Sequence, residues 1–142
     1  MRRMFLAVSG AVLGVALVMG VGVRAEQAQD PAMIDKTMKA VGPAFGAVRK
    51  AVDGGMMAEA KAGAESLSKS MAETEAFFKS HGKADGVELA QAGKKAADAI
   101  AAAASADAAK GAMGELGKTC QGCHSKYREK AADGTYIFKS GN

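Results

Sequence analysis

Five consecutive residues near the end of the chain, Cys120-Gln121-Gly122-Cys123-His124, combine two thiols and an imidazole. A Cys-x-x-Cys-His run is the attachment signature of a covalently bound c-type haem. Each thiol can add to one haem vinyl group to form a thioether, and the imidazole can bind the iron as the proximal axial ligand. If the segment is helical, residues three apart share a face and the next residue lies about 100° further round. Both sulfur atoms then reach the porphyrin edge while the imidazole reaches over its face.

Three other uses of such a cysteine pair compete with haem attachment: a dithiol redox motif, half of a zinc site and a structural disulfide. A zinc site needs two more ligands, and besides His124 the chain offers only His81 and no further cysteine. A thioredoxin-like motif follows a strand and opens a helix, and no strand pattern precedes Cys120. The histidine directly after the second cysteine, together with an export signal upstream, favours haem.

The N-terminus has the three parts of a secretory signal. An Arg2-Arg3 pair is followed by an apolar run from Met4 to Val23 and by a small-x-small cleavage site, Val23-Arg24-Ala25. We expect residues 1–25 to be a signal peptide and residues 26–142 to form the mature haem domain. An uncleaved membrane anchor is the alternative, because the apolar run is nearly long enough to span a bilayer. Export agrees with covalent haem, which in bacteria belongs to the oxidising side of the membrane, and predicts a periplasmic protein.

The net charge of +4 comes mostly from this signal. Removing Arg2, Arg3 and Arg24 from the 19 basic residues leaves 16 against 15 acidic ones, and haem propionates would lower the net charge further. A nearly neutral mature chain has no basic footprint for nucleic acid. Its length fits a single domain.

A first helix is predicted from Asp30 to Asp53. Asp30-Pro31 supplies an N-cap followed by proline at the first helical position, and glycines follow Asp53. Pro43 predicts a kink, because the apolar period continues through it, with a true break as the alternative. Steps of four and three place the apolar residues on one stripe, which consists of Ile34, Met38, Val41, Phe45, Val48 and Val52.

Three more helices with the same apolar spacing follow. The second is expected from about Met57 to His81, with Gly82 as its cap, and the third from about Asp85 to Ala104. The fourth begins at a cap provided by Ser105 or Asp107 and is expected to end near residue 131. Their stripes are Met57, Ala60, Ala64, Leu67, Met71, Thr74 and Phe78; Leu89, Gly93, Ala96, Ile100 and Ala103; and Ala109, Met113, Leu116, Cys120, Cys123 and Tyr127.

The fourth stripe carries both cysteines, so the haem is expected on a helix face directed at the core and not on a loop. No alternating strand pattern of any length occurs, and the predicted fold class is all-α. Four amphipathic helices with short connections predict an antiparallel up-down-up-down four-helix bundle. The tail reads as a turn at Asp133-Gly134 and a short apolar extended stretch, Tyr136-Ile137-Phe138, which crosses the haem edge or covers a neighbouring helix.

Met38 is the candidate for the sixth ligand. In this topology the start of the first helix and the end of the fourth lie at the same end of the bundle. At about 1.5 Å per residue, Met38 and His124 each lie roughly 10 Å in from that end. A thioether there can face the haem from the side opposite His124, which gives His/Met ligation. An ordinary core methionine is the alternative reading, and His81 is a weaker candidate because it closes the second helix.

The residues directly after the motif are further candidates for haem contact. Tyr127 lies on the same stripe as the cysteines, and Arg128 follows one turn after His124. The guanidinium of Arg128 could lie near a propionate or the proximal face, and a solvated helix-end charge is an equal alternative. Aromatic side chains at Phe45, Phe77 or Phe78 fit a haem pocket, but they fit plain core as well.

The segment from Cys120 to Lys130 resembles the cytochrome c′ / cytochrome c-556 family, whose last helix typically reads Cys-x-x-Cys-His-x-x-Tyr/Phe-Arg-x-Lys. The segment from Asp35 to Gly42 is similar to the first helix of low-spin c-556 members, in which a methionine four residues before a glycine is the sixth ligand. The resemblance implies that Cys120 and Cys123 attach one haem c, with His124 proximal and Met38 distal. The tail beyond Lys130 is longer than in family members that stop near that point.

Two functions follow from these expectations. A haem with His/Met ligation suits a periplasmic electron carrier, because its oxidation state changes with little rearrangement. A five-coordinate haem of the cytochrome c′ type would instead bind nitric oxide or carbon monoxide. No second acid–base constellation lies on the stripes, so an enzyme is not expected. The expected partners are redox proteins of unknown identity, with a homodimer through the first two helices implied by the resemblance and a membrane only if the signal stays uncleaved.

Overall fold

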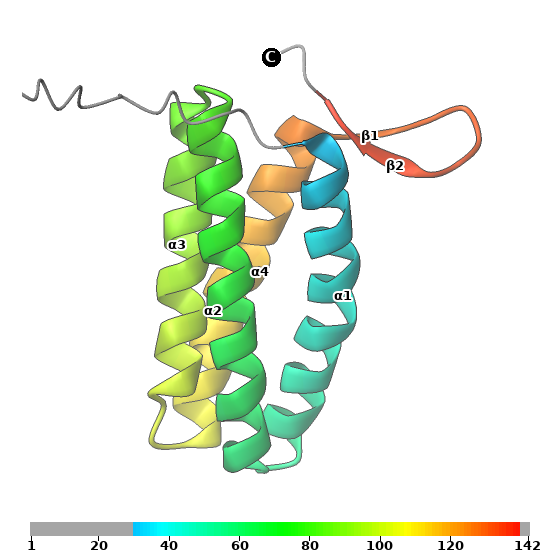
Figure 1. Ribbon diagram of the computed structural model, residues 1–142. Coiled ribbons are helices and arrows are strands. Elements are labelled where there is room, and N and C mark those ends of the chain that lie inside the picture. The colour runs from blue at the N-terminus through cyan, green and yellow to red at the C-terminus, as the bar shows by residue number, and fades with distance from the viewer. Residues whose placement is uncertain (1–29, 140–142) are drawn as a thin grey trace, which may run out of the picture.

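Four antiparallel helices form an up-down-up-down bundle in the computed structural model (Figure 1), which confirms the predicted all-α fold class. The structure describes residues 30–139, so the predicted signal peptide at 1–25 lies outside the described residues. The helices are α1 (Pro31–Asp53), α2 (Met57–Ser80), α3 (Ala84–Ala101) and α4 (Ala106–Tyr127). Within the described part of the chain, none of these helices is long and apolar enough to cross a membrane.

Local sequence signals account for the helix ends. The carboxylate of Asp30 accepts a hydrogen bond of 2.9 Å from the backbone N–H of Ala32, and the hydroxyl of Ser105 caps α4 by accepting from Ala108 at 3.3 Å. Ser105, and not Asp107, is therefore the cap of the fourth helix. Pro43 lies inside α1, which continues as one helix through it, so the alternative of a break is wrong.

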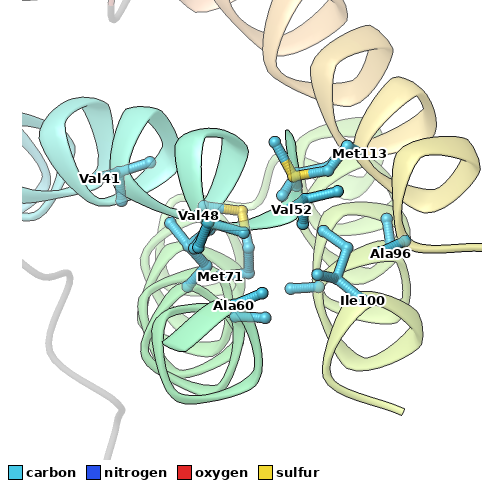
Figure 2. Close-up of a cluster of buried hydrophobic side chains, with 14 residues drawn as sticks. Val41, Val48, Val52, Ala60, Met71, Ala96, Ile100 and Met113 are labelled. Carbon is cyan, nitrogen blue, oxygen red and sulfur yellow. The ribbon is translucent and has the colours of Figure 1, made fainter. Parts of the chain in front are cut away.

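Two groups of buried side chains hold the bundle together. The central core joins all four helices, and in Figure 2 Val52 of α1, Ile100 of α3 and Met113 of α4 converge with side chains of α2. The second group, which we call the aromatic cluster, lies at the end of the bundle where α1 begins and α4 finishes. Its buried members are Ile34, Phe77, Phe78, Ala90 and Tyr127.

The predicted stripes agree with the buried faces at most positions, and the differences on α1 and α4 are informative. Ile34, Val41, Val48 and Val52 are buried as expected, whereas the stripe positions Met38 and Phe45 are only partly buried. On α4 the two cysteines are likewise only partly buried. The α1 and α4 faces are therefore incompletely packed against each other.

The chain after α4 forms a small hairpin, in which the predicted turn and the extended stretch Tyr136-Ile137-Phe138 are present but the pairing with residues 128–130 was not predicted. Strands β1 (Arg128–Lys130) and β2 (Tyr136–Phe138) pair antiparallel. The fourth helix therefore ends at Tyr127, four residues earlier than expected. Three-residue strands are too short to show an alternating pattern, and the turn between them is set by Gly134, whose φ is +86°.

The hairpin is anchored on the aromatic cluster. The ring of Phe138 lies 4.9 Å from Phe77 and 5.9 Å from Tyr127, measured between ring centroids. The backbone N–H of Lys139 donates a 2.8 Å hydrogen bond to the carbonyl of Tyr127. The tail thus covers a neighbouring helix, at the end of α2, and its crossing of the haem edge stays a prediction.

Gly86 allows α3 to approach α2 closely at this end of the bundle. A Cβ at this position would lie 2.4 Å from the ring of Phe78, a residue that is 2% exposed. We expect Gly86→Ala to lower the free energy of unfolding by about 1–3 kcal/mol, because the ring must shift in a packed core. Urea denaturation followed by circular dichroism measures the change.

Gly111→Ala is the matched control for that variant. Gly111 lies inside α4, and a Cβ there meets nothing within 4 Å. The substitution should raise the free energy of unfolding by about 0.5–1 kcal/mol, since alanine favours the helix. Equal effects of the two substitutions would show that Gly86 is not a packing requirement.

Candidate haem site

Both cysteines of the motif lie in the last two turns of α4, at the border between the two groups of buried side chains. Cys120 packs against the central core and Cys123 against the aromatic cluster. No disulfide joins them. Because residues three apart share a helix face, both thiols are directed to the same side of α4, as two thioethers to one porphyrin edge require.

The surroundings of the thiols disfavour their ionised form. Burial raises the pKa of the Cys120 thiol. Burial, followed by the nearby Cys120 and the carboxylate of Asp85, raises the pKa of the Cys123 thiol to about 11. Since the thiolate is the reactive species, burial favours the protonated, less reactive form of both thiols.

The imidazole of His124 has the protonation state that a metal ligand needs. The side chain is partly buried, and burial together with the positive charge of Arg128 lowers its pKa. The neutral ring is therefore favoured at neutral pH, and a neutral imidazole is the form that binds iron. Within residues 30–139, no protein group forms a hydrogen bond with the His124 ring.

Met38 lies on α1 where the central core and the aromatic cluster meet, and its partly buried side chain packs against both. Its neighbours on the stripe are more fully buried: Ile34 is 7% exposed and Val41 is 8% exposed. The same two groups of side chains include Cys120 and Cys123 respectively. Met38 therefore contacts both of the groups of buried side chains that the two cysteines contact.

A cavity of about 410 Å³ separates α1 from α4 below this point. It begins at Gly117, one helical turn before Cys120, and its floor is largely apolar. The lining residues on α1 are Phe45, Arg49, Val52 and Asp53, and those on α4 are Lys110, Met113, Gly114 and Gly117. The incomplete packing between α1 and α4 thus continues from the motif into an open space.

Comparison with known protein families gives one match. Residues 81–128 match the family model described as Cytochrome C′. The matched segment runs from the end of α2 through α3 and α4 and contains the whole Cys-x-x-Cys-His motif. The matched segment covers less than half of the chain and supports a c-type cytochrome. No curated protein and no solved structure matches the chain.

A match to this family implies a haem cofactor. The residues present fit that cofactor. Two neighbouring thiols, a neutral imidazole and a thioether form a donor set for haem attachment and iron ligation, and they lie beside partly open packing between α1 and α4. A zinc site or a dithiol redox motif does not account for the family match.

The other two predicted haem contacts, Tyr127 and Arg128, interact with other side chains of the protein. Tyr127 is 4% exposed and packs its ring 4.7 Å from Phe78, and its hydroxyl donates a hydrogen bond to Asp85. The guanidinium of Arg128 lies 4.1 Å above the ring of Tyr136. Haem contact by Tyr127 and Arg128 therefore stays a prediction.

His81 lies at the end of α2, as the sequence indicated. Its ring is 4.2 Å from that of Phe77, and its Nδ1 is 2.8 Å from the carbonyl oxygen of Phe77. Because the carbonyl can only accept, Nδ1 carries the proton in this contact. The histidine thus satisfies a carbonyl at the helix C-terminus.

Asp85 is a residue of this site that sequence reasoning missed. From the first turn of α3 its carboxylate accepts hydrogen bonds from Tyr127 and Lys126, which flank the motif on its C-terminal side. The hydrogen bonds from Lys126 and then Tyr127 lower the pKa of Asp85 to about 2. An acidic residue in a first helical turn is ordinary in sequence, so only the folded contact identifies it.

The low pKa of Asp85 predicts a specific acid dependence of stability. Its folded pKa of about 2 lies below the model-compound value of 3.8, so its contribution is present above pH 3.8 and is lost as the pH falls towards 2. We expect Asp85→Asn to be less stable than the parent protein at pH 6, with the difference shrinking between pH 4 and pH 2. Urea denaturation at several pH values measures this.

Asp107→Asn is the control for the acid dependence. Asp107 lies in the first turn of α4, at the opposite end of the bundle, and pairs only with the exposed Lys110 on its own helix. This substitution should leave the pH dependence of stability unchanged. A parallel pH profile for the parent protein and Asp85→Asn would contradict the role given to Asp85.

Proposed function

We propose that this cytochrome is an exported electron carrier with one covalent haem c, held by Cys120 and Cys123 and ligated by His124 and Met38. The observation that carries the proposal is the position of Met38. Its side chain packs against the two groups of buried residues that also contact Cys120 and Cys123. A thioether on α1 that packs against the same groups of side chains as the attachment site on α4 supports Met38 as the axial ligand opposite His124.

Each of these side chains has a distinct role in the proposal. The bound haem supplies one-electron chemistry at its iron, and methionine ligation raises its reduction potential. The two cysteines fix the cofactor to α4, and the neutral imidazole of His124 provides the proximal ligand. The partly buried Met38 would provide the second axial ligand.

A periplasmic location is part of the same proposal. Residues 1–25 have the composition of a secretory signal, and thioether attachment of haem belongs to the oxidising side of bacterial membranes. The match to the cytochrome c′ family model supports a carrier.

The visible spectrum of the purified holoprotein tests the ligation. His/Met ligation predicts sharp low-spin bands in the reduced state, a weak sulfur-to-iron band at the red end in the oxidised state, and slow binding of carbon monoxide. Broad high-spin bands with rapid carbon monoxide binding would contradict Met38 ligation. They would support the gas-binding function of a five-coordinate haem in its place.

A further inference from the structure

The hairpin after α4 has two faces with different chemistry. Cross-strand partners share a face, and successive residues alternate between faces. The pairs Arg128–Phe138 and Lys130–Tyr136 therefore lie on one face, and the pair Glu129–Ile137 lies on the other. Both basic strand residues are thus separated from the acidic residue of the same strand.

The basic face changes from buried to exposed along the hairpin. Phe138 is packed on the aromatic cluster, whereas Tyr136 is 52% exposed and Lys130 is exposed beside it. Figure 1 shows the hairpin projecting sideways past the start of α1, so its outer part overhangs the bundle. Arg128, Lys130 and Tyr136 together form this part of the face, which we call the overhanging face.

The overhanging face is directly connected to the haem-binding turn. The backbone N–H of Arg128 donates to the carbonyl of His124, and the charge of Arg128 acts on the His124 imidazole. A protein bound to the overhanging face would therefore lie close to the proposed haem. The guanidinium of Arg128 stacks on the ring of Tyr136. Arginine and tyrosine are both enriched among the residues that contribute most to the binding energy of protein interfaces.

We propose that the overhanging face is the docking site for an acidic surface patch of a redox partner protein. The inference rests on the proposed function as an electron carrier. Its support is charge complementarity: two cations and one exposed aromatic ring lie on one face, while the carboxylate of Asp133 accepts hydrogen bonds from Thr135 within the turn. Such a surface steers and orients a partner of opposite charge.

Two other occupants fit the face less well. An anionic lipid surface favours apolar side chains that insert together, but the exposed Tyr136 and Ile137 lie on opposite faces of the hairpin. A second copy of the chain would bring two basic faces together, and like charges in contact are unfavourable.

The test is the rate at which a strongly acidic flavodoxin in its hydroquinone form reduces the ferric holoprotein. The flavodoxin loses one electron and becomes a semiquinone, while the haem iron passes from ferric to ferrous. For the unmodified protein we expect the rate to fall as ionic strength rises. For Lys130→Glu/Tyr136→Ser we expect a rate about tenfold lower at low ionic strength, with the difference from the parent narrowing at about 1 M salt, where charges are screened beyond roughly 3 Å.

Two further variants separate docking from general effects. Lys61→Glu/Met56→Ser makes the same charge change and removes another exposed apolar side chain, 42% exposed, at the opposite end of the bundle. Ile137→Ser alters the other face of the same hairpin. Both should keep the parent rate within about twofold, which is small beside the effects of steering. A tenfold loss in either one, or no loss in Lys130→Glu/Tyr136→Ser, would overturn the proposal.

A small reductant keeps this result apart from the proposed function itself. Dithionite should reduce all the variants at the parent rate, since it needs no docking surface. If dithionite reduced the haem normally but flavodoxin reduced Lys130→Glu/Tyr136→Ser as fast as the parent, the docking site would be wrong and the carrier function would stand. If the parent haem were not reduced by dithionite, the carrier function would fail. Binding of the parent protein to phosphatidylserine vesicles, lost in Lys130→Glu/Tyr136→Ser, would overturn the docking proposal in favour of a membrane surface.

Discussion

Cys120→Ser/Cys123→Ser is expected to abolish covalent haem attachment in a host that matures c-type cytochromes. Serine preserves the size of both side chains, but its hydroxyl does not add to a haem vinyl group to form a thioether. The chain contains only these two cysteines, so no other thiol can replace them. Mass spectrometry of the denatured protein should show one haem on the parent chain and none on the double variant.

The single variants define the contribution of each sulfur. Cys120→Ser and Cys123→Ser should each retain one thioether and carry haem at a reduced yield. His124→Ala, in contrast, keeps both thiols and removes the proximal ligand, so attached haem should show an altered spectrum. Haem bound covalently to the double variant, or bare polypeptide from the parent gene, would contradict the attachment site.

Met38→Ala is expected to convert the haem spectrum from low spin to high spin and to open the distal face to carbon monoxide. Loss of the thioether should also lower the reduction potential by roughly 100 mV or more, because the choice of axial ligands spans about 0.8 V across haem proteins. Potentiometric titration and stopped-flow mixing with carbon monoxide measure the two effects.

Met71→Ala is the control for the loss of a methionine. Met71 is 6% exposed and lies in the central core, so its truncation should cost about 2–5 kcal/mol of unfolding free energy. It should leave the ligation spectrum unchanged. A Met38→Ala variant with the parent spectrum would remove Met38 as a ligand, whatever its stability.

Most of the bundle could be predicted because short-range spacing determines it. Apolar residues three and four apart identify a buried helix face without knowledge of the partner, and the period that continues through Pro43 correctly indicated an unbroken α1. The attachment motif is equally local, since its chemistry depends on five adjacent residues. Fold class, helix number and the candidate residues Cys120, Cys123 and His124 therefore follow from sequence alone.

The parts that could not be predicted depend on contacts between distant residues. The hairpin pairs Arg128 with Phe138, and three-residue strands give no pattern that a reader of the sequence could recognise. Asp85 meets Tyr127 across 42 positions of sequence, and Gly86 is required by the ring of Phe78 on another helix. Such contacts appear only when the helices are in place. For the same reason the partly buried state of Met38 was not evident from its stripe position.

The distribution of aromatic side chains has a practical consequence. The chain contains two tyrosines and no tryptophan, and both tyrosines lie at the end of the bundle that carries the motif, one in α4 and one in β2. Intrinsic ultraviolet emission therefore originates entirely beside the proposed cofactor. An attached porphyrin would quench the tyrosine fluorescence through energy transfer. Strong fluorescence would therefore identify protein without haem, and weak fluorescence would identify the holoprotein.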